Sequence, residues 1–139
     1  PYVGLGTGLN QNSGPPNYQI TDLRVYDGIK LWIKGNGETY HIKIPYLDNS
    51  GNNLTGYDDY KYSFSTASQW TQLTLPFSSF TQAGWGTSAS LNDVLANAKD
   101  MRDYFWSEGL LNLINHTIKI RLVLINTPLF VIFQHMLII

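Results

Sequence analysis

The sequence predicts an all-β fold, an antiparallel β-sandwich or jelly roll with one short helix near residues 91–101. Short runs of alternating apolar and polar residues recur along the chain, and clusters of Gly, Pro, Asn and Asp separate them. Only the segment near residues 91–101 has the spacing of an amphipathic helix. The 139 residues suffice for one core, and the absence of Cys excludes disulfides. We therefore expect a single domain over residues 1–139, with about six to nine short strands.

Composition and charge narrow the class of function. Charged residues make up 14% of the chain, the net charge is −1 and the pI is about 6.3. Nucleic-acid binding needs a basic face, so we predict no nucleic-acid partner. Hydrophobic residues make up 43%, which excludes intrinsic disorder, and aromatic residues reach 14%. This profile is typical of secreted binding domains. The sequence starts at Pro1 without a visible signal peptide, so we expect a mature, processed or truncated chain.

The first predicted strands lie before residue 47. Residues 2–10 form an extended run interrupted by Gly, and the Gly-Pro-Pro segment within residues 10–17 predicts a loop. Residues 29–34 alternate cleanly between apolar and polar side chains, and residues 39–46 do the same. Because Asn and Gly tolerate positive φ, residues 35–37 predict a hairpin turn that pairs these two strands.

Two more strands and two polar loops follow. Residues 48–56 and 78–87 read as loops, the second around Gly84-Trp85-Gly86. Residues 60–64 alternate again, and residues 70–77 form a strand that Pro76 ends or places at an edge.

The segment from Ser90 to Met101 predicts the only helix. Ser90 is the expected N-cap, and Asp93 stands three positions later, as in a capping box. The predicted buried face consists of Leu91, Val94, Leu95 and Ala98.

Residues 102–139 form an atypical, apolar C-terminal segment. Residues 118–139 are long enough to span a bilayer, but charged and polar residues such as Lys119 and Arg121 interrupt them. One or two buried strands, broken at Thr127-Pro128, are the alternative that we favour. Residues from Leu129 onward need cover on both faces or a neighbouring molecule. The segment is either a genuine tail that pairs with a neighbouring subunit or the product of a frame change.

The sequence does not favour an enzyme. A glycosidase needs two carboxylates across a cleft, and the adjacent Asp58 and Asp59 would point to opposite faces of a strand. The two Glu residues are distant from each other, no G-x-S-x-G motif is present, and the three His residues lack metal-ligand spacing.

Residues 48–59 only weakly match a calcium-binding loop. Asp48-x-Ser50-x-Asn52 has the alternating oxygen donors, but Asn53 replaces the glycine at loop position 6 and Asp59 replaces the glutamate at position 12. A solvated turn is the better interpretation of these residues.

Sugar binding is the chemistry that the residues favour. A glucan chain offers apolar faces and hydroxyls, so its receptor needs exposed aromatic rings beside polar side chains. Trp32 is on the non-core face of its strand, and we expect His41 and Lys61 to share that face. Tyr2, Tyr57 and Trp85 lie in loops or at strand ends. The alternative is that loops or the helix cover Trp32 and Trp85, and Trp70 is predicted to be structural.

Two stretches carry a family resemblance: YDGIKLWIKGNGETYHIKI, residues 26–44, and YKYSFSTASQWTQLTLPFSSFTQAGWG, residues 60–86. They resemble carbohydrate-binding module family 11 and the related complex I intermediate-associated protein 30 family, which shares the jelly roll. The resemblance covers about residues 18–98, and the element from Trp70 to Phe80 is its most specific part. It implies a galactose-binding-like jelly roll with a concave face and a structural calcium ion.

The resemblance also implies site residues. Family members build the cleft from the opening strand, the strand before PFSSF and the loop after it, which here points to Tyr2, Asp59 and Trp85, with Gln82 as a polar neighbour. The Arg and Asp that family members carry after PFSSF are absent. The first strands of the family also have no counterpart before Pro1, so we expect a domain truncated at its N-terminus.

We predict a non-catalytic module that binds β-1,4- or mixed β-1,3-1,4-glucan beside a secreted glycoside hydrolase. The first alternative is a structural or assembly subunit, a homo-oligomer in which the apolar tail pairs with a neighbour. The second is an intracellular assembly chaperone of the complex I-associated type. The predicted carbohydrate-binding residues are Tyr2, Trp32, His41, Asp59, Lys61, Gln82 and Trp85.

Overall fold

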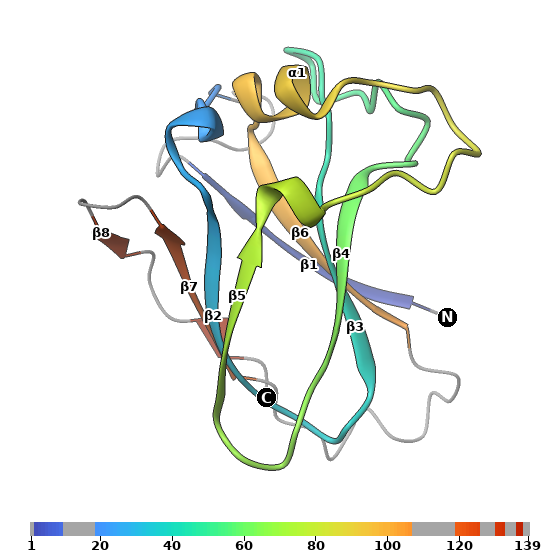
Figure 1. Ribbon diagram of the computed structural model, residues 1–139. Helices are drawn as coiled ribbons and strands as arrows, with labels where there is room; N and C mark the ends of the chain where they lie inside the picture. The colour runs from blue at the N-terminus through green and yellow to red at the C-terminus, as the bar shows by residue number, and fades with distance from the viewer. Residues whose placement is uncertain (1, 10–18, 107–118, 126–129, 133–135, 138–139) are drawn as a thin grey trace.

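Two antiparallel sheets face each other across one hydrophobic core in a computed structural model, which describes residues 2–9, 19–106, 119–125, 130–132 and 136–137 (Figure 1). One sheet has the strand order β1-β6-β3-β4, and the other has the order β5-β2-β7-β8, with β9 also paired to β7. The predicted jelly roll with one short helix is confirmed. The elements are β1 (Tyr2–Gly8), η1 (Leu23–Val25), β2 (Gly28–Lys34), β3 (Thr39–Ile44), β4 (Tyr60–Ser65), β5 (Thr71–Pro76), η2 (Phe77–Ser79), α1 (Leu91–Ala96), β6 (Asp100–Trp106), β7 (Lys119–Ile125), β8 (Phe130–Ile132) and β9 (Met136–Leu137).

Alternation along the strands builds the core. In β2, Ile29, Leu31 and Ile33 are fully buried, because every second residue of a strand points to the same face. In β3, Tyr40, Ile42 and Ile44 do the same from the opposite sheet. The residues between them face outward, so each sheet presents an outer face to solvent.

The predicted hairpin between β2 and β3 is wrong. β2 pairs with β5 and β7, whereas β3 pairs with β4 and β6, so residues 35–38 form a corner between the two sheets. Two hydrogen bonds from the chain after β4 hold this corner. The Thr66 Oγ1 accepts from Gly37 N at 3.1 Å, and the Ala67 O accepts from Gly35 N at 2.8 Å. Gly37 has φ 94°, so the positive φ that predicted a hairpin turn serves the corner instead.

The helix is shorter than predicted. The Ser90 Oγ accepts a hydrogen bond from Asp93 N at 3.0 Å, which confirms the N-cap. The helix ends at Ala96, because Thr21 N donates to Ala98 O at 2.6 Å and so draws residue 98 into a bridge with Thr21. β6 then begins at Asp100, within the range that we had assigned to the helix.

Strands from the C-terminal segment lie in both sheets. β6, which the sequence did not predict, lies between β1 and β3, and β7 lies between β2 and β8. The strand predicted from residue 118 is therefore confirmed as β7. No helix among the described residues is long and apolar enough to cross a membrane. The predicted loop at residues 10–17 and the break at Thr127-Pro128 lie outside the described residues.

Aromatic residues of the PFSSF element pack against β4. The rings of Phe77 and Phe80 lie 5.8 Å apart, and that of Phe80 lies 5.7 Å from Tyr62. Phe77 and Phe80 are buried, and each contributes about 2–3 kcal/mol by leaving water. This packing fixes residue 80, and the chain that follows it pairs with β4 at Lys61.

Candidate functional site

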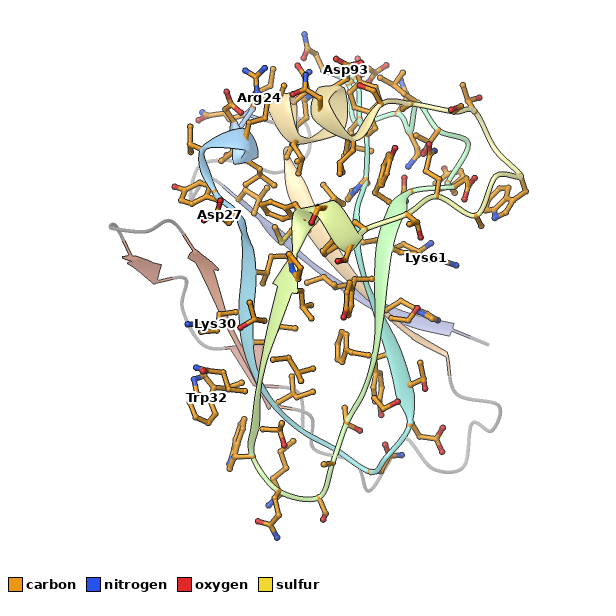
Figure 2. All side chains as sticks on the ribbon, in the orientation of Figure 1. Arg24, Asp27, Lys30, Trp32, Lys61 and Asp93 are labelled. Carbon is orange, nitrogen blue, oxygen red and sulfur yellow. The ribbon has the colours of Figure 1, made fainter. Side chains whose placement is uncertain are left out.

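The outer face of the four-stranded sheet carries a polar patch on β3 and β4. His41 and Lys43 alternate with the core residues of β3, and the register places Ser63 opposite His41 and Lys61 opposite Lys43. The His41 Nδ1 lies 2.8 Å from Ser63 Oγ. Figure 2 shows Lys61 on the side of β4 that points away from β2 and β5. We call these four residues the sheet patch.

His41 is kept neutral by its surroundings. Partial burial, and then the positive charges of Lys61 and Lys43, lower the pKa of the imidazole below its usual value. A neutral imidazole has one donor and one acceptor nitrogen, so His41 can exchange hydrogen bonds with a hydroxyl without adding charge to the patch.

Two loops extend this face beyond the end of β4. We call residues 53–59 and 81–89 the loop cluster. Lys61 N donates to Thr81 O at 3.0 Å and Thr81 N donates to Lys61 O at 3.1 Å, so the second loop continues directly from the edge of the sheet. Thr87 N donates to Thr55 O at 2.9 Å and joins the two loops.

Asp58 is the centre of the loop cluster. It is only 3% exposed, and its carboxylate accepts four backbone hydrogen bonds, from the N–H groups of Ala83 (2.8 Å), Gly84 (2.7 Å), Trp85 (3.0 Å) and Gly86 (3.2 Å). Burial acts to raise its pKa, but these bonds outweigh it and lower the pKa below the ordinary value. The ionised carboxylate therefore fixes the backbone that carries Trp85.

Gly86 brings the two loops into contact. A Cβ at this position would collide with Thr55 O and would lie 2.6 Å from Asp58 Cβ. Only glycine permits this approach without a shift of the backbone. The loop cluster is therefore preorganised, which lowers the entropic cost of binding.

Two predicted site residues belong to this framework. The Gln82 Nε2 donates to Asp58 O at 2.7 Å and to Thr87 O at 3.0 Å, while its Oε1 accepts from Ala89 N at 3.0 Å. Asp59 is 2% exposed, and its Oδ1 accepts from Asn53 Nδ2 at 2.7 Å and Thr55 Oγ1 at 2.8 Å. We therefore assign both side chains to the loop cluster rather than to ligand contact.

Two exposed aromatic side chains belong to the loop cluster. Trp85 is 66% exposed and Tyr57 is 63% exposed. Tyr57 has φ 71°, which is uncommon for a bulky residue, and its N–H donates to Asn53 Oδ1 at 2.8 Å. Tyr57 was not in the predicted set of site residues. Its place after Gly56 in a polar loop was the only signal, and a sequence pattern cannot show that this loop meets the one carrying Trp85.

The remaining predicted residues are divided between the two sheets. Trp32 lies on β2, in the five-stranded sheet, so it does not share a face with His41 and Lys61 as expected. The backbone of Tyr2 lies in β1, at the edge of the four-stranded sheet opposite β4. Trp70, predicted to be structural, is 46% exposed.

The described residues do not assemble a metal centre. They contain no group of three or more His, Cys, Asp or Glu side chains that could hold an ion. In the loop that weakly matched a calcium site, Asp48 accepts hydrogen bonds from Ser50 N, Asn52 N and Asn52 Nδ2 at 2.8–2.9 Å. These bonds make a turn closed on itself, in agreement with the solvated-turn interpretation. A structural calcium ion elsewhere stays a prediction.

Comparison with models of known protein families shows to which family the chain belongs. The family model for Complex I intermediate-associated protein 30 (CIA30) matches residues 9–101, well over half of the chain. The chain belongs to the CIA30 family. A search of curated protein sequences gave no significant match.

A solved structure supports the fold of this CIA30-family chain. The family 11 carbohydrate-binding module of the cellulosomal cellulase Lic26A-Cel5E of Clostridium thermocellum is similar, with a TM-score of 0.50 and 16% identity over 76% of the chain. A family 11 module from the same organism, in complex with a β-1,3-1,4-mixed-linked tetrasaccharide, has a TM-score of 0.47 and 18% identity over 76% of the chain. The chain spans 58% and 59% of these two modules. Both resemblances expected from the sequence are confirmed.

Proposed function

We propose that the protein is a non-catalytic carbohydrate-binding domain whose ligand lies across the sheet patch and the loop cluster. The observation that carries this proposal is the combination of two exposed aromatic side chains, Trp85 and Tyr57, with a preorganised backbone beside a polar sheet face. Aromatic rings stack on the apolar faces of sugars, and the patch offers hydrogen-bonding groups for hydroxyls.

The geometry favours binding over bond cleavage. Asp58 and Asp59 are both buried and both accept hydrogen bonds from the protein itself. A general acid and a general base must instead reach the scissile bond.

We propose a neutral β-glucan, β-1,4- or mixed β-1,3-1,4-linked, as the ligand. We further propose that the domain is secreted and works beside a glycoside hydrolase, in line with the similar cellulosomal module.

Family membership favours a second candidate, an assembly function. The matching family is described as an intermediate-associated protein of complex I. In that case the sheet patch and the loop cluster would hold a protein partner in place of a sugar.

Titration calorimetry with soluble mixed-linkage β-glucan separates the two candidates. We expect saturable, micromolar-class binding, about −8 kcal/mol, and we expect Trp85→Ala to weaken it at least about tenfold. Trp32→Ala is the matched control, because it removes an exposed indole from the opposite sheet. Absence of binding by the folded chain, or an equal loss in both variants, would refute a sugar site at the loop cluster.

A further inference from the structure

The outer face of the five-stranded sheet has a different chemistry from the sheet patch. Lys30, Trp32 and Lys34 alternate along β2 with its buried residues, and Figure 2 shows Lys30 and Trp32 on the side of β2 that points away from β3 and β4. On β5, the exposed Gln72 is paired with Trp32 and the exposed Thr74 with Lys30. We call these five residues, together with Trp70, the basic aromatic face.

Two indoles lie open to solvent on this face. Trp32 is 41% exposed and Trp70 is 46% exposed. Trp70 directly precedes Thr71, which pairs with Ile33, so it lies at the Lys34 end of the strand pair. Burying such large side chains would be favourable, so a pair left exposed on a rigid sheet indicates a surface that another molecule covers.

The charge of the face is positive and unbalanced. In the part of the chain that the structure describes, the only ion pair joins Arg24 to Asp22, so Lys30 and Lys34 have no carboxylate partner there. The five strands of this sheet contain four basic residues and no acidic residue. The other two basic residues are on β7, where the register aligns Arg121 with Trp32 and Lys119 with Lys34.

We propose that the basic aromatic face binds a polysaccharide containing uronic acids. Sugar rings stack on the indoles, carboxylates pair with the lysines, and hydroxyls bond to Gln72 and Thr74. Lys30 and Lys34 are four residues apart on one strand, about 13 Å, so the face suits an extended anionic chain better than a small anion.

This site is independent of the proposed β-glucan site. The two sheets are back to back, and packed sheets are about 10 Å apart, so one ligand cannot contact both outer faces at once without passing around an edge.

Titration of the full chain with polygalacturonate tests the proposal. We expect saturable binding that weakens as salt is raised, because the lysines are exposed. We expect at least about a tenfold loss of affinity in Trp32→Ala and in the double variant Lys30→Gln/Lys34→Gln. Trp85→Ala, on the opposite face, should leave this binding unchanged, and Trp32→Ala should leave any binding of neutral β-glucan unchanged.

Three results would overturn the proposal. The first is no polygalacturonate binding by the folded chain. The second is a loss in Trp85→Ala as large as in Trp32→Ala. The third is tighter binding of a single-stranded oligonucleotide or of anionic vesicles, lost in Trp32→Ala, which would assign the face to another class of ligand. Circular dichroism and the melting temperature verify that each variant is folded, and failure of β-glucan to bind leaves this test intact.

Discussion

Asp58 lies just before the first residue of β4 and connects this strand to the loop that carries Trp85. Its carboxylate accepts hydrogen bonds from the four backbone N–H groups of residues 83–86. These four residues are distant from Asp58 in the sequence. Charge-assisted hydrogen bonds of this kind are stronger than neutral ones, so one side chain sets the conformation of the loop that carries Trp85. The proposed sugar site therefore depends on a residue whose carboxylate is buried and bonded to the protein itself.

Replacement of Asp58 by Asn should destabilise the protein by about 2 kcal/mol at neutral pH, because the backbone donors lose a charged acceptor. The pKa of Asp58 is lowered by folding, so its contribution is present above the unfolded value near 4 and is lost as the pH falls through the folded pKa. Thermal melts of both proteins from pH 7 to pH 2.5 should show a difference that shrinks in acid.

Asp48→Asn is the control for this measurement. Asp48 also accepts backbone N–H bonds, but within its own exposed turn. If Asp48→Asn lowered the stability as much as Asp58→Asn, this result would contradict the conclusion that the Asp58 contacts between the two loops are especially stabilising.

At the scale of elements, alternation predicted the strands better than it predicted their partners. The strands β2, β3, β4 and β5 and the N-cap of α1 follow from local patterns that the structure confirms. The corner at residues 35–38 could not be distinguished from a hairpin, because both need a turn and positive φ. What separates them is Thr66, distant in sequence, whose hydroxyl binds Gly37 N.

The candidate site depended on that corner. With β2 and β3 in one sheet, Trp32 would lie beside His41, whereas in the structure they lie on opposite sheets. Lys61 is a predicted residue that the structure connects to the loop carrying Trp85, through the bridge between Lys61 and Thr81. The Asp58 contacts join segments about 25 residues apart, and no local sequence pattern indicates such a contact.

Gly86→Ala tests the contact between the two loops of the loop cluster. The added methyl group would collide with Thr55 O, so we expect a displaced loop and a loss of about 1–3 kcal/mol in the free energy of unfolding. β-Glucan affinity should fall with it. Denaturant titration and calorimetry measure both effects, and Ser88→Ala, at an exposed position of the same loop, is the control. Unchanged stability and affinity in Gly86→Ala would show that the contact is dispensable.

At the scale of the whole molecule, one sandwich presents two outer faces of unlike chemistry. The four-stranded sheet carries His41 beside the cross-strand pair of Lys43 and Lys61, and the loop cluster with Trp85 and Tyr57 extends it. The five-stranded sheet carries Trp32 beside Lys30 on its outer face (Figure 2). Strands from the C-terminal segment complete both sheets, so the faces depend on residues at both ends of the sequence.

The most direct test of the proposed sugar site is a nuclear magnetic resonance titration that follows the indole N–H signals of the Trp residues while a mixed-linkage β-glucan tetrasaccharide is added. Ring stacking changes the environment of the indole that takes part in it. We expect a saturable shift of the Trp85 signal and no shift of the Trp32 and Trp70 signals. A shift at Trp32 with none at Trp85, or no shift in any of the three, would contradict it.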